Sequence, residues 1–346
     1  MSDPKKSEKV TMKMLAIELG LSTATVSKAL RDSYEISAET KARVIAAAGK
    51  LNYIPNPFAS SLRNSRSHTI AIILPEIADS FFSQAINGIE TIVSQYQYHA
   101  LIYLTHESYQ REVQLFTELN SGRVDGVLLS VSCETADTKH IQHLLDTDLP
   151  LVFFDRISEG LAAASVRTND RESAYLATSH LLTQGCKRIS LLTIDGFPAM
   201  LQSRAKGYKE ALNDEKYPLY SNILSCHSKY DADNINLINQ HIEEYHPDGL
   251  VITVEHLATS AYMACKELKL KIPAEIKIIC FTNQLTASIL QPPLSTVQQP
   301  AYEMGKQAAE LLFQQLTGKQ MSFQQRVLPS VLIIRESSTP DINGQM

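Results

Sequence analysis

Residues 11–30 read TMKMLAIELGLSTATVSKAL, and this stretch predicts two short helices joined by a glycine turn. Thr11 can cap the first helix, whose apolar residues follow the i, i+3, i+4, i+7 spacing of one helical face. Gly20 can end that helix, because glycine tolerates the left-handed backbone of a sharp turn. Ser22 can cap the second helix. A pair of helices spaced in this way predicts a helix-turn-helix.

The second helix would carry small polar residues and one lysine on its outward face. These residues are Thr23, Ala24, Ser27 and Lys28. A helix presented in this way fits the major groove of DNA, with its first residues at the base edges. The hydroxyls of Ser22, Thr25 and Ser27 are candidate phosphate ligands, together with the amides of the helix N-terminus. The alternative is an ordinary three-helix module that binds another protein.

A third helix is predicted over about 38–51, and a linker with two prolines, IPNPFASSLRNSRS, follows at 54–67. Asn56 can cap a helix of about two turns, which is too short to be stable alone in water. Ala59 would allow close packing against a symmetry mate, and Leu62 can wedge between base pairs in the minor groove. The linker therefore predicts a hinge helix that forms on DNA, with a contact to its own domain as the alternative for the leucine.

The charge is divided unevenly along the chain. The whole chain has 32 Lys and Arg against 37 Asp and Glu, a formal net charge of −5. Residues 1–68 hold 11 basic and 6 acidic residues, which leaves 21 basic and 31 acidic residues in 69–346. A head of +5 on a body of −10 indicates that only the head meets a polyanion. Random asymmetry of a solvated surface is the alternative.

From Thr69 onward, apolar runs alternate with amphipathic helices. The runs are IAIIL, ALIYL, GVLLSV, LVFF, ISLLTI, GLVITV and IKIICF, and the predicted helices cover about 80–96, 108–121, 171–184, 203–214, 231–245, 256–268 and 302–316. This alternation predicts parallel strands covered on both faces. VDGVLLS at 124–130 is echoed by PDGLVIT at 247–253, which indicates two similar lobes. A ligand site is expected between them, at the strand ends.

Several classes of protein are not expected. The five cysteines are odd in number and lack CxxC spacing, which argues against structural zinc or a disulfide framework and fits a reducing cytosol. No apolar run approaches the roughly 18 residues of a membrane helix, and the N-terminus lacks the apolar core of a secretory signal. GxG, P-loop, HExxH and GxSxG motifs are absent, so neither catalysis nor a cofactor or metal is expected.

Several motifs along the chain support one resemblance. They are TVSKAL, LNYIPN and an A-x-x-L pair in the head and linker, and PEIADSFFSQAINGIE, RVDGVLLS, FDR, AYLATSHLLTQGCKRISLL, SRAKGY and PPLSTVQQPAYEMG in the body. These motifs resemble the LacI/GalR family of bacterial transcription regulators. The resemblance implies an α + α/β fold: a helix-turn-helix head with a hinge helix, followed by a two-lobed, periplasmic-binding-protein-like body of parallel sheets. It also implies a cytoplasmic, nucleoid-associated homodimer that binds double-stranded operator DNA and a small-molecule effector, often a carbohydrate or a derivative.

The expected domain limits follow from the motifs. They are 1–54 for the helix-turn-helix domain, 55–68 for the hinge, 69–335 for the effector-binding domain and 336–346 for a tail. The first lobe would hold about 69–166 and 296–320, and the second about 167–295 and 321–335. Because the tail has no leucine heptad, a dimer is expected rather than a tail-driven tetramer.

The resemblance also implies roles for single residues in DNA binding. Thr23, Ala24 and Lys28 would be the main base-reading residues, and Ala59 and Leu62 the hinge contacts. The first two are small, so they would read thymine methyl groups or make single hydrogen bonds, whereas the lysine can reach guanine O6 and N7.

In the body, Phe81 and Phe82 follow the first strand and can stack on a sugar ring or a base, with a place in the core as the alternative. The resemblance implies that Asp155 and Arg204 face the effector. A carboxylate there would accept hydroxyl bonds, and a guanidinium would donate two bonds at once. A surface ion pair is the alternative for the arginine.

Two stretches depart from the family pattern. The family commonly has Asn-Asp after the strand in VITVEH, where this chain has Val254, Glu255 and His256. It also commonly has Asp after IKIICF, where this chain has Thr282 followed by Asn283. We expect His256, Thr282 and Asn283 to face the effector. The loss of an acidic acceptor at 282 argues against a neutral hexose and favours a phosphorylated or otherwise acidic ligand.

The expected function is a repressor whose operator affinity is set by a ligand in the cleft. A ligand that binds one closure state better shifts its population and, reciprocally, the affinity for DNA. A solute-binding protein with the same body is the alternative, but it would need a signal peptide and no basic head. A nonspecific DNA binder is a further alternative, which the salt dependence of binding would separate.

Overall fold

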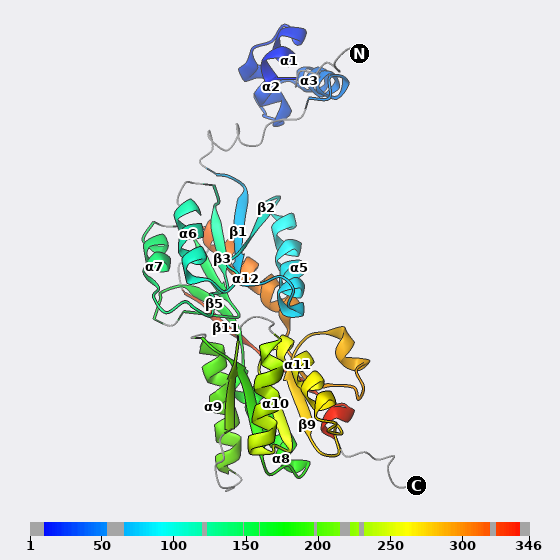
Figure 1. Ribbon diagram of the computed structural model, residues 1–346. Helices are drawn as coiled ribbons and strands as arrows, with labels where there is room; N and C mark the ends of the chain where they lie inside the picture. The colour runs from blue at the N-terminus through cyan, green and yellow to red at the C-terminus, as the bar shows by residue number, and fades with distance from the viewer. Residues whose placement is uncertain are drawn as a thin grey trace, which may run out of the picture. The chain divides into compact units, whose positions relative to one another are not determined.

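The computed structural model describes residues 10–53, 66–119, 123–147, 149–158, 160–196, 199–214, 222–227, 232–318 and 323–339 (Figure 1). The chain forms two compact units, which divide between Arg66 and Ser67. The predicted hinge residues Asn56, Ala59 and Leu62 lie outside the described residues.

The first unit holds three helices: α1 (Met12–Leu19), α2 (Thr23–Leu30) and α3 (Ala38–Lys50). Each begins at a capping hydroxyl, from Thr11, Ser22 and Ser37 respectively, that accepts a hydrogen bond from a backbone amide of the first turn. Such a cap stabilises a helix by about 1 kcal/mol. Gly20 ends α1 with a left-handed backbone, φ 64°. The predicted helix-turn-helix and its two caps are confirmed.

The core of the first unit is small. Its buried apolar residues are Leu15, Ala16, Val26, Ala29, Val44 and Ala48. The alanines among them let the helix backbones approach, and the three larger side chains fill the space between. Since a small unit has few such side chains, each one contributes a large share of its stability.

The first lobe of the body is built on a six-stranded sheet in the order β11-β5-β4-β3-β1-β2. Its strands are β1 (Thr69–Leu74), β2 (His99–Leu104), β3 (Gly126–Leu129), β4 (Leu151–Phe154), β5 (Ala164–Thr168) and β11 (Gln325–Leu328), all paired in parallel. Alternate residues of β1 pack to opposite faces. One face is covered by α5 (Ser80–Gln95) and α12 (Ala301–Leu316), the other by α6 (Tyr109–Leu119) and α7 (Lys139–Leu145).

The second lobe repeats this plan with the sheet order β12-β10-β9-β8-β6-β7. Its strands are β6 (Ile189–Ile194), β7 (Asn222–Cys226), β8 (Gly249–Ile252), β9 (Lys277–Phe281), β10 (Ser295–Gln298) and β12 (Val331–Ile333), with only β12 antiparallel among the described pairs. Its helices are α8 (Asp170–Thr183), α9 (Ala199–Asp214), α10 (Asp233–Tyr245) and α11 (Glu255–Glu267), with short 3-10 helices η1 (Leu285–Ser288) and η2 (Glu336–Ser338).

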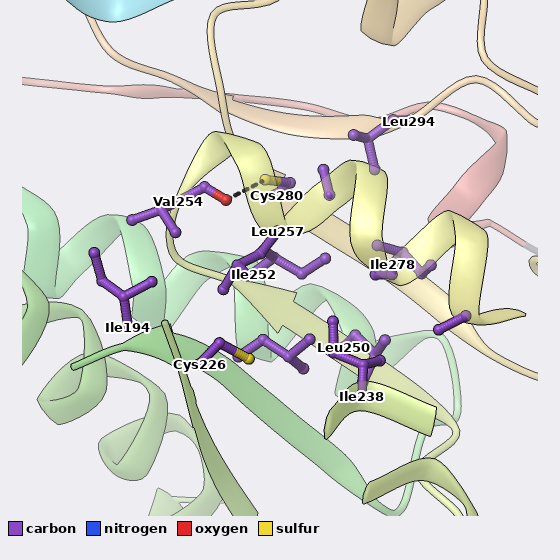
Figure 2. Close-up of a cluster of buried hydrophobic side chains, with 14 of the residues drawn as sticks. Ile194, Cys226, Ile238, Leu250, Ile252, Val254, Leu257, Ile278, Cys280 and Leu294 are labelled. Atoms are coloured by element: carbon purple, nitrogen blue, oxygen red, sulfur yellow. Dashed lines mark hydrogen bonds between the residues drawn. The ribbon is translucent and has the colours of Figure 1, made fainter. Parts of the chain in front are cut away.

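One core of the second lobe fills the space between the sheet and the pair α10 and α11. Figure 2 shows Ile252 and Ile278 of the sheet beside Ile238 of α10 and Leu257 of α11. All four side chains are fully buried. Most of the continuous apolar runs of the sequence therefore correspond to strands buried on both faces, but the run ALIYL forms the edge strand β2, where Leu101 and Ile102 are 44% and 42% exposed.

Helix pairs in both lobes cross closely at glycines. A Cβ on Gly305 of α12 would overlap the carbonyl oxygen of Ala85 in α5, and a Cβ on Gly207 of α9 would overlap that of Arg171 in α8. Only glycine allows these backbones to touch, and the same device appears in both lobes.

The Asp-Gly echo has a structural basis. Asp125, before β3, accepts hydrogen bonds from the amides of Ser67 (2.6 Å) and His68 (2.9 Å), where the chain enters β1. Asp248, before β8, accepts one from the amide of Arg188 (2.8 Å), where the chain enters β6. Each aspartate thus holds the entry to the neighbouring strand of its own lobe.

The structure corrects the predicted limits of the lobes. Residues 295–298 form β10 in the second sheet, although 296–298 were predicted in the first lobe. Residues 325–328 form β11 in the first sheet, although they were predicted in the second lobe. Residues 167–168 belong to β5 of the first sheet rather than to the second lobe. These strands are short and have no long apolar run, so their place depends on pairing with distant strands rather than on local pattern.

The predicted tail is also corrected, because its first residues belong to the second lobe. Ser337 and Ser338 in η2 are fully buried. The Ser337 hydroxyl donates to the carbonyl of Ile278 (2.7 Å) in β9. In the described part of the chain, none of the helices combines the length and apolar character needed to cross a membrane.

Candidate nucleic-acid interface and effector cleft

The N-terminal end of α2 is the most accessible part of the predicted DNA-reading helix. Thr23 and Ala24 are exposed, and Ser27 and Lys28 are partly exposed further along the helix. Val26 and Ala29 on the opposite face are buried in the core of the head. The helix therefore offers one polar face to a partner.

The hydroxyls at the helix starts have structural partners. The Ser22 and Thr25 hydroxyl oxygens lie 2.8 Å apart, and Ser22 also accepts the Thr25 amide (3.0 Å). The Ser27 hydroxyl accepts from the guanidinium of Arg31 (3.2 Å), and Thr11 caps α1. Of these groups, Ser22 and Thr25 fix the start of the reading helix, where backbone amides without a partner in the helix are also found.

Lys28 forms an ion pair that the sequence analysis missed. Its ammonium donates to the carboxylate of Glu35, with 39% and 45% of the two side chains exposed. An exposed pair of this kind stabilises by at most about 1 kcal/mol. A guanine edge or a phosphate can therefore take the lysine away from the glutamate.

In the body, the predicted effector residues converge from both lobes at the carboxyl ends of the strands. A cavity of about 30 Å³ is lined by six of them: Phe81, Phe82, Asp155, Arg204, Thr282 and Asn283. The seventh, His256, lines an adjoining cavity of about 310 Å³. The smaller space holds a water molecule or two, whereas the larger is in the range of ligand pockets.

Phe81 and Phe82 belong chiefly to the core of the first lobe. They lie in the first turn of α5, 5% and 2% exposed, with their rings edge to face at 5.3 Å. Phe82 also packs edge to face on Phe154 and lines both cavities. Core packing, the alternative, accounts for most of their surface, and only a part faces the cleft.

Arg204 is buried rather than part of a surface ion pair. It is 1% exposed, and its Nε donates to the Asp170 carboxylate (2.7 Å). One of its Nη atoms donates to the carbonyl of Thr253, and the guanidinium lies 4.1 Å from the centre of the Phe281 ring. The arginine thus fastens α9 to α8 and to the end of β8 beneath the cleft.

Asp155 lies directly after β4 with a left-handed backbone, φ 61°. Burial raises the pKa of its carboxyl to about 6, although the guanidiniums of Arg156 and Arg204 oppose the rise. The amide of Gln299 lies 3.5 Å from it. Its carboxyl group faces the small cavity and can accept hydroxyl bonds there.

Thr282 and Asn283 connect elements instead of standing free in the cleft. The Thr282 hydroxyl donates to the carboxylate of Glu255 (2.6 Å). The Asn283 amide donates to the side chain of Gln84 (3.0 Å) in the other lobe and to the carbonyl of Gln299 (2.8 Å). Thus the carboxylate that is absent at 282 is supplied by residue 255, which the sequence analysis did not select.

Two further residues were missed at the larger cavity. Arg156 donates one Nη to both carboxylate oxygens of Glu107 (2.8 and 3.0 Å), and Glu107 accepts the amide of Cys133 (2.7 Å). Both charged side chains are nearly buried. The FDR motif contained the arginine, whereas nothing local distinguished the glutamate.

The larger cavity is acidic. Its carboxylates are Glu76, Asp79, Glu107 and Glu255, and its one guanidinium is that of Arg156. Burial lowers the pKa of the His256 imidazole, so its neutral form is favoured. A phosphorylated or acidic ligand would meet like charge from these carboxylates, which weighs against the acidic ligand predicted from residue 282. An acceptor-rich cavity favours a ligand with hydroxyl or amine donors.

A third cavity, of about 530 Å³, adjoins the small one at Asp155 and Met200, between β5, α8 and α9. Within the described residues, no group of three His, Cys, Asp or Glu side chains is placed to hold a metal ion.

The carboxyl of Asp79 provides a test of the cleft electrostatics. Burial, the nearby Glu255 and, to a smaller extent, Asp155 raise its pKa to about 7 from an ordinary 3.8. The hydrogen bond from the Phe81 amide and the charge of Arg156 lower the pKa and oppose this rise. Between these values the folded state binds more protons than the unfolded chain, so the free energy of unfolding falls as pH rises toward 7. We expect a loss of about 1–2 kcal/mol between pH 5.5 and 7 from this group.

The substitution Asp79→Asn keeps a side-chain oxygen to cap α5 and removes the titration. We expect the variant to unfold at a higher temperature than the wild type at pH 8, and the difference to shrink toward pH 5.5. Calorimetric melting across this range measures it. A constant difference at all pH values would contradict the assignment, as would a flat profile for the wild type.

Comparison with known proteins identifies both units. Residues 11–56 match the model for bacterial regulatory proteins of the lacI family, residues 70–247 match a periplasmic binding protein domain, and residues 178–338 match a periplasmic binding protein-like domain. The chain is 30% identical to the ribose operon repressor of Haemophilus influenzae, over 94% of this chain and 98% of that protein. It is also 30% identical to the transcriptional repressor CytR of Escherichia coli, over 98% and 99% of the two chains.

Among solved structures, the lac repressor dimer bound to operator and an anti-inducer is similar, with a TM-score of 0.83. It shares 22% sequence identity and covers 96% of this chain and 100% of that one, which confirms the predicted fold. The match at residues 11–56 also decides against a solute-binding protein, which would have the body without this head. The chain therefore belongs to the LacI family of bacterial regulatory proteins and is a DNA-binding transcriptional regulator.

Proposed function

We propose that this protein is a repressor that binds a two-fold symmetric operator as a homodimer, and that a small polyhydroxylated effector in the cleft controls its affinity for DNA. The observation that carries the proposal is a capped, accessible reading helix on the same chain as a cleft lined from both lobes. As a regulator that binds the chromosome, it would act in the cytoplasm. The relatives are named as repressors, and we expect no catalytic activity.

Recovery of bound fragments from random DNA tests the DNA part of the proposal. Because a dimer presents two heads, the recovered sites should contain two inverted half-sites. Binding should lose affinity steeply with salt on all DNA, while the preference for the selected site persists. Fragments without symmetry, or equal affinity for selected and random DNA, would refute a sequence-specific dimer.

Lys28 is the proposed reader of guanine, beside Thr23 and Ala24. Replacing it with alanine should weaken operator binding by about 1–3 kcal/mol. Glu35→Gln should act in the opposite direction by at most about 1 kcal/mol, because it releases the lysine from its ion pair. A gel-shift titration on selected and random DNA measures both changes. Unchanged operator affinity in Lys28→Ala would remove the lysine from the reading set.

The effector is proposed to be a neutral carbohydrate or a similar molecule with several hydroxyl donors. Four carboxylates line a cavity of about 310 Å³, which suits hydroxyl donors and repels phosphate. The similarity to a ribose operon repressor over nearly the whole chain supports a sugar ligand. Isothermal titration with matched neutral and phosphorylated sugars tests this. Binding of only the phosphorylated members would overturn the proposed ligand chemistry and leave the DNA-binding role intact.

A further inference from the structure

One carboxylate joins the two lobes. Glu255, the first residue of α11 in the second lobe, is 6% exposed. Its Oε1 accepts the backbone amide of Ser80 (2.9 Å) and its Oε2 accepts the Ser80 hydroxyl, both from the first lobe. The Thr282 hydroxyl of its own lobe completes the set at 2.6 Å. Among the described residues, the donors bonded to this carboxylate are neutral groups.

The place of this contact makes it strong. Ser80 begins α5, where the helix N-terminus presents unpaired amides and a positive dipole end. Asp79 of the same lobe accepts the Phe81 amide, so the amide of Ser80 is capped from across the cleft. Hydrogen bonds to a buried charged group are worth roughly twice those between neutral groups.

Two more contacts cross between the lobes near this one. Asn283 donates to Gln84 of α5 (3.0 Å). Gly196, at the end of β6, lies against Cys133 of the first lobe: a Cβ added there would stand 2.7 Å from the Cys133 carbonyl oxygen. The lobes are therefore so close that a single methyl group at 196 does not fit between them.

The same closeness limits the space for a ligand. The cavity among the six converging residues measures about 30 Å³, far below the roughly 300 Å³ of a small ligand pocket. Glu255 also lines the adjoining cavity of about 310 Å³, so a molecule bound there would lie beside the carboxylate that joins the lobes.

We propose that Glu255 is a latch that holds the two lobes closed through its bonds to Ser80 and Thr282, and that an effector in the adjoining cavity acts on this carboxylate. This inference rests on the proposed function, because closure of the lobes has a regulatory role only if an effector in the cleft controls DNA binding. Glu255 is a positioning residue: its carboxylate bridges the two Ser80 donors of the first lobe and the Thr282 hydroxyl of the second. The regulator then has a closed state of its own, and the effector alters the balance between this state and an open one.

The distance between the lobes in the full-length protein tests the latch without any effector. Spin labels at Gln110→Cys on α6 and Thr259→Cys on α11 sit at exposed positions, four or fewer residues from the cavity-lining His106, Glu107, Glu255 and His256. The five native cysteines are buried. Pulsed electron paramagnetic resonance then gives the distribution of distances across the cleft.

We expect one short distance between the two spin labels in the protein that keeps Glu255. Glu255→Ala should raise the ratio of open to closed molecules at least tenfold, because two buried charge-assisted bonds between the lobes are lost. Glu255→Gln, which keeps the size, should shift the ratio in the same direction by less. Gly196→Ala should also disturb the closed lobes, because its Cβ would stand 2.7 Å from the Cys133 carbonyl oxygen and because alanine is strained at φ +133°. Ser83→Ala is the matched control, since that hydroxyl bonds only the Ser80 carbonyl within its own helix (3.0 Å).

An unchanged distribution in Glu255→Ala overturns the latch, whatever Gly196→Ala does. A parent distribution that already equals that of Glu255→Ala is the same negative result. If Glu255→Ala melts below the working temperature, Glu255→Gln supplies the same comparison. These results are independent of operator selection, so failure of the latch and failure of the proposed function are distinguished.

Discussion

Replacing Leu15 with alanine should unfold the DNA-binding head and leave the body intact. Leu15 is fully buried in a small core, in which six buried apolar residues are surrounded by eight partly buried ones. Removing a buried leucine side chain costs about 2–5 kcal/mol, and a core of this size supplies about 3–5 kcal/mol in total. We therefore expect the calorimetric transition of the head to disappear or fall sharply, and operator affinity to drop at least tenfold. The transition of the body should not move, because the chain forms two units.

Ile45→Ala on α3 is the matched control, since that isoleucine is 61% exposed. A large-to-small change on the surface should alter the stability of the head by less than about 0.5 kcal/mol. If Leu15→Ala and Ile45→Ala melted alike, the packing of the three helices described above would be wrong. The comparison also separates loss of folding from loss of a DNA contact.

Asp170→Ala should be the most damaging single change near the cleft. It removes the carboxylate partner of Arg204, and the guanidinium has almost no access to water. Breaking a buried ion pair from one side costs about 3–5 kcal/mol, because the remaining charge is uncompensated. We expect the transition of the body to fall accordingly, with effector binding reduced because α9 is no longer fastened to α8. Thermal melting and titration with the effector measure the two effects.

Two comparisons show whether the uncompensated charge of Arg204 causes the loss of stability. The double variant Asp170→Ala with Arg204→Met should recover most of the lost stability, since it removes both charges. Glu210→Gln breaks a neighbouring but accessible pair with Arg171, whose side chains are 31% and 59% exposed, and should cost less than about 1 kcal/mol. Equal losses in Asp170→Ala and Glu210→Gln would contradict the role given to burial.

The cleft shows that residues far apart in the sequence together set the chemistry of one site. Thr282 in place of an expected aspartate indicated a missing acceptor and hence an acidic ligand. In the structure, Glu255 brings a carboxylate to the same place and accepts the threonine hydroxyl. The sequence comparison named Glu255 as well, but the distance along the chain gave no sign that residues 255 and 282 meet. The charge of a site is a property of the whole set of residues that line it.

The phenylalanines illustrate a similar limit. Their place after the first strand was correctly recognised, and the strand end does lie at the cleft. Yet Phe81 and Phe82 pack mainly against the core, because the first turn of α5 directs most of each ring into the lobe. The sequence predicted the position of the two phenylalanines after the strand, but not the direction in which their side chains point.

What the sequence determined by itself is the local structure and the class of protein. The hydroxyl caps at Thr11 and Ser22 and the glycine turn at 20 depend on neighbours within four residues, and the apolar runs of the body depend on continuous burial. What only the tertiary structure decided is the contact between distant segments: the pairing of β11 with β5, the burial of Arg204 on Asp170, and the bridge from Glu255 to Ser80. The physical reason is that helix caps and periodic burial are encoded by spacing along the chain. A bond between residues 80 and 255 exists only after two lobes have folded and closed upon each other.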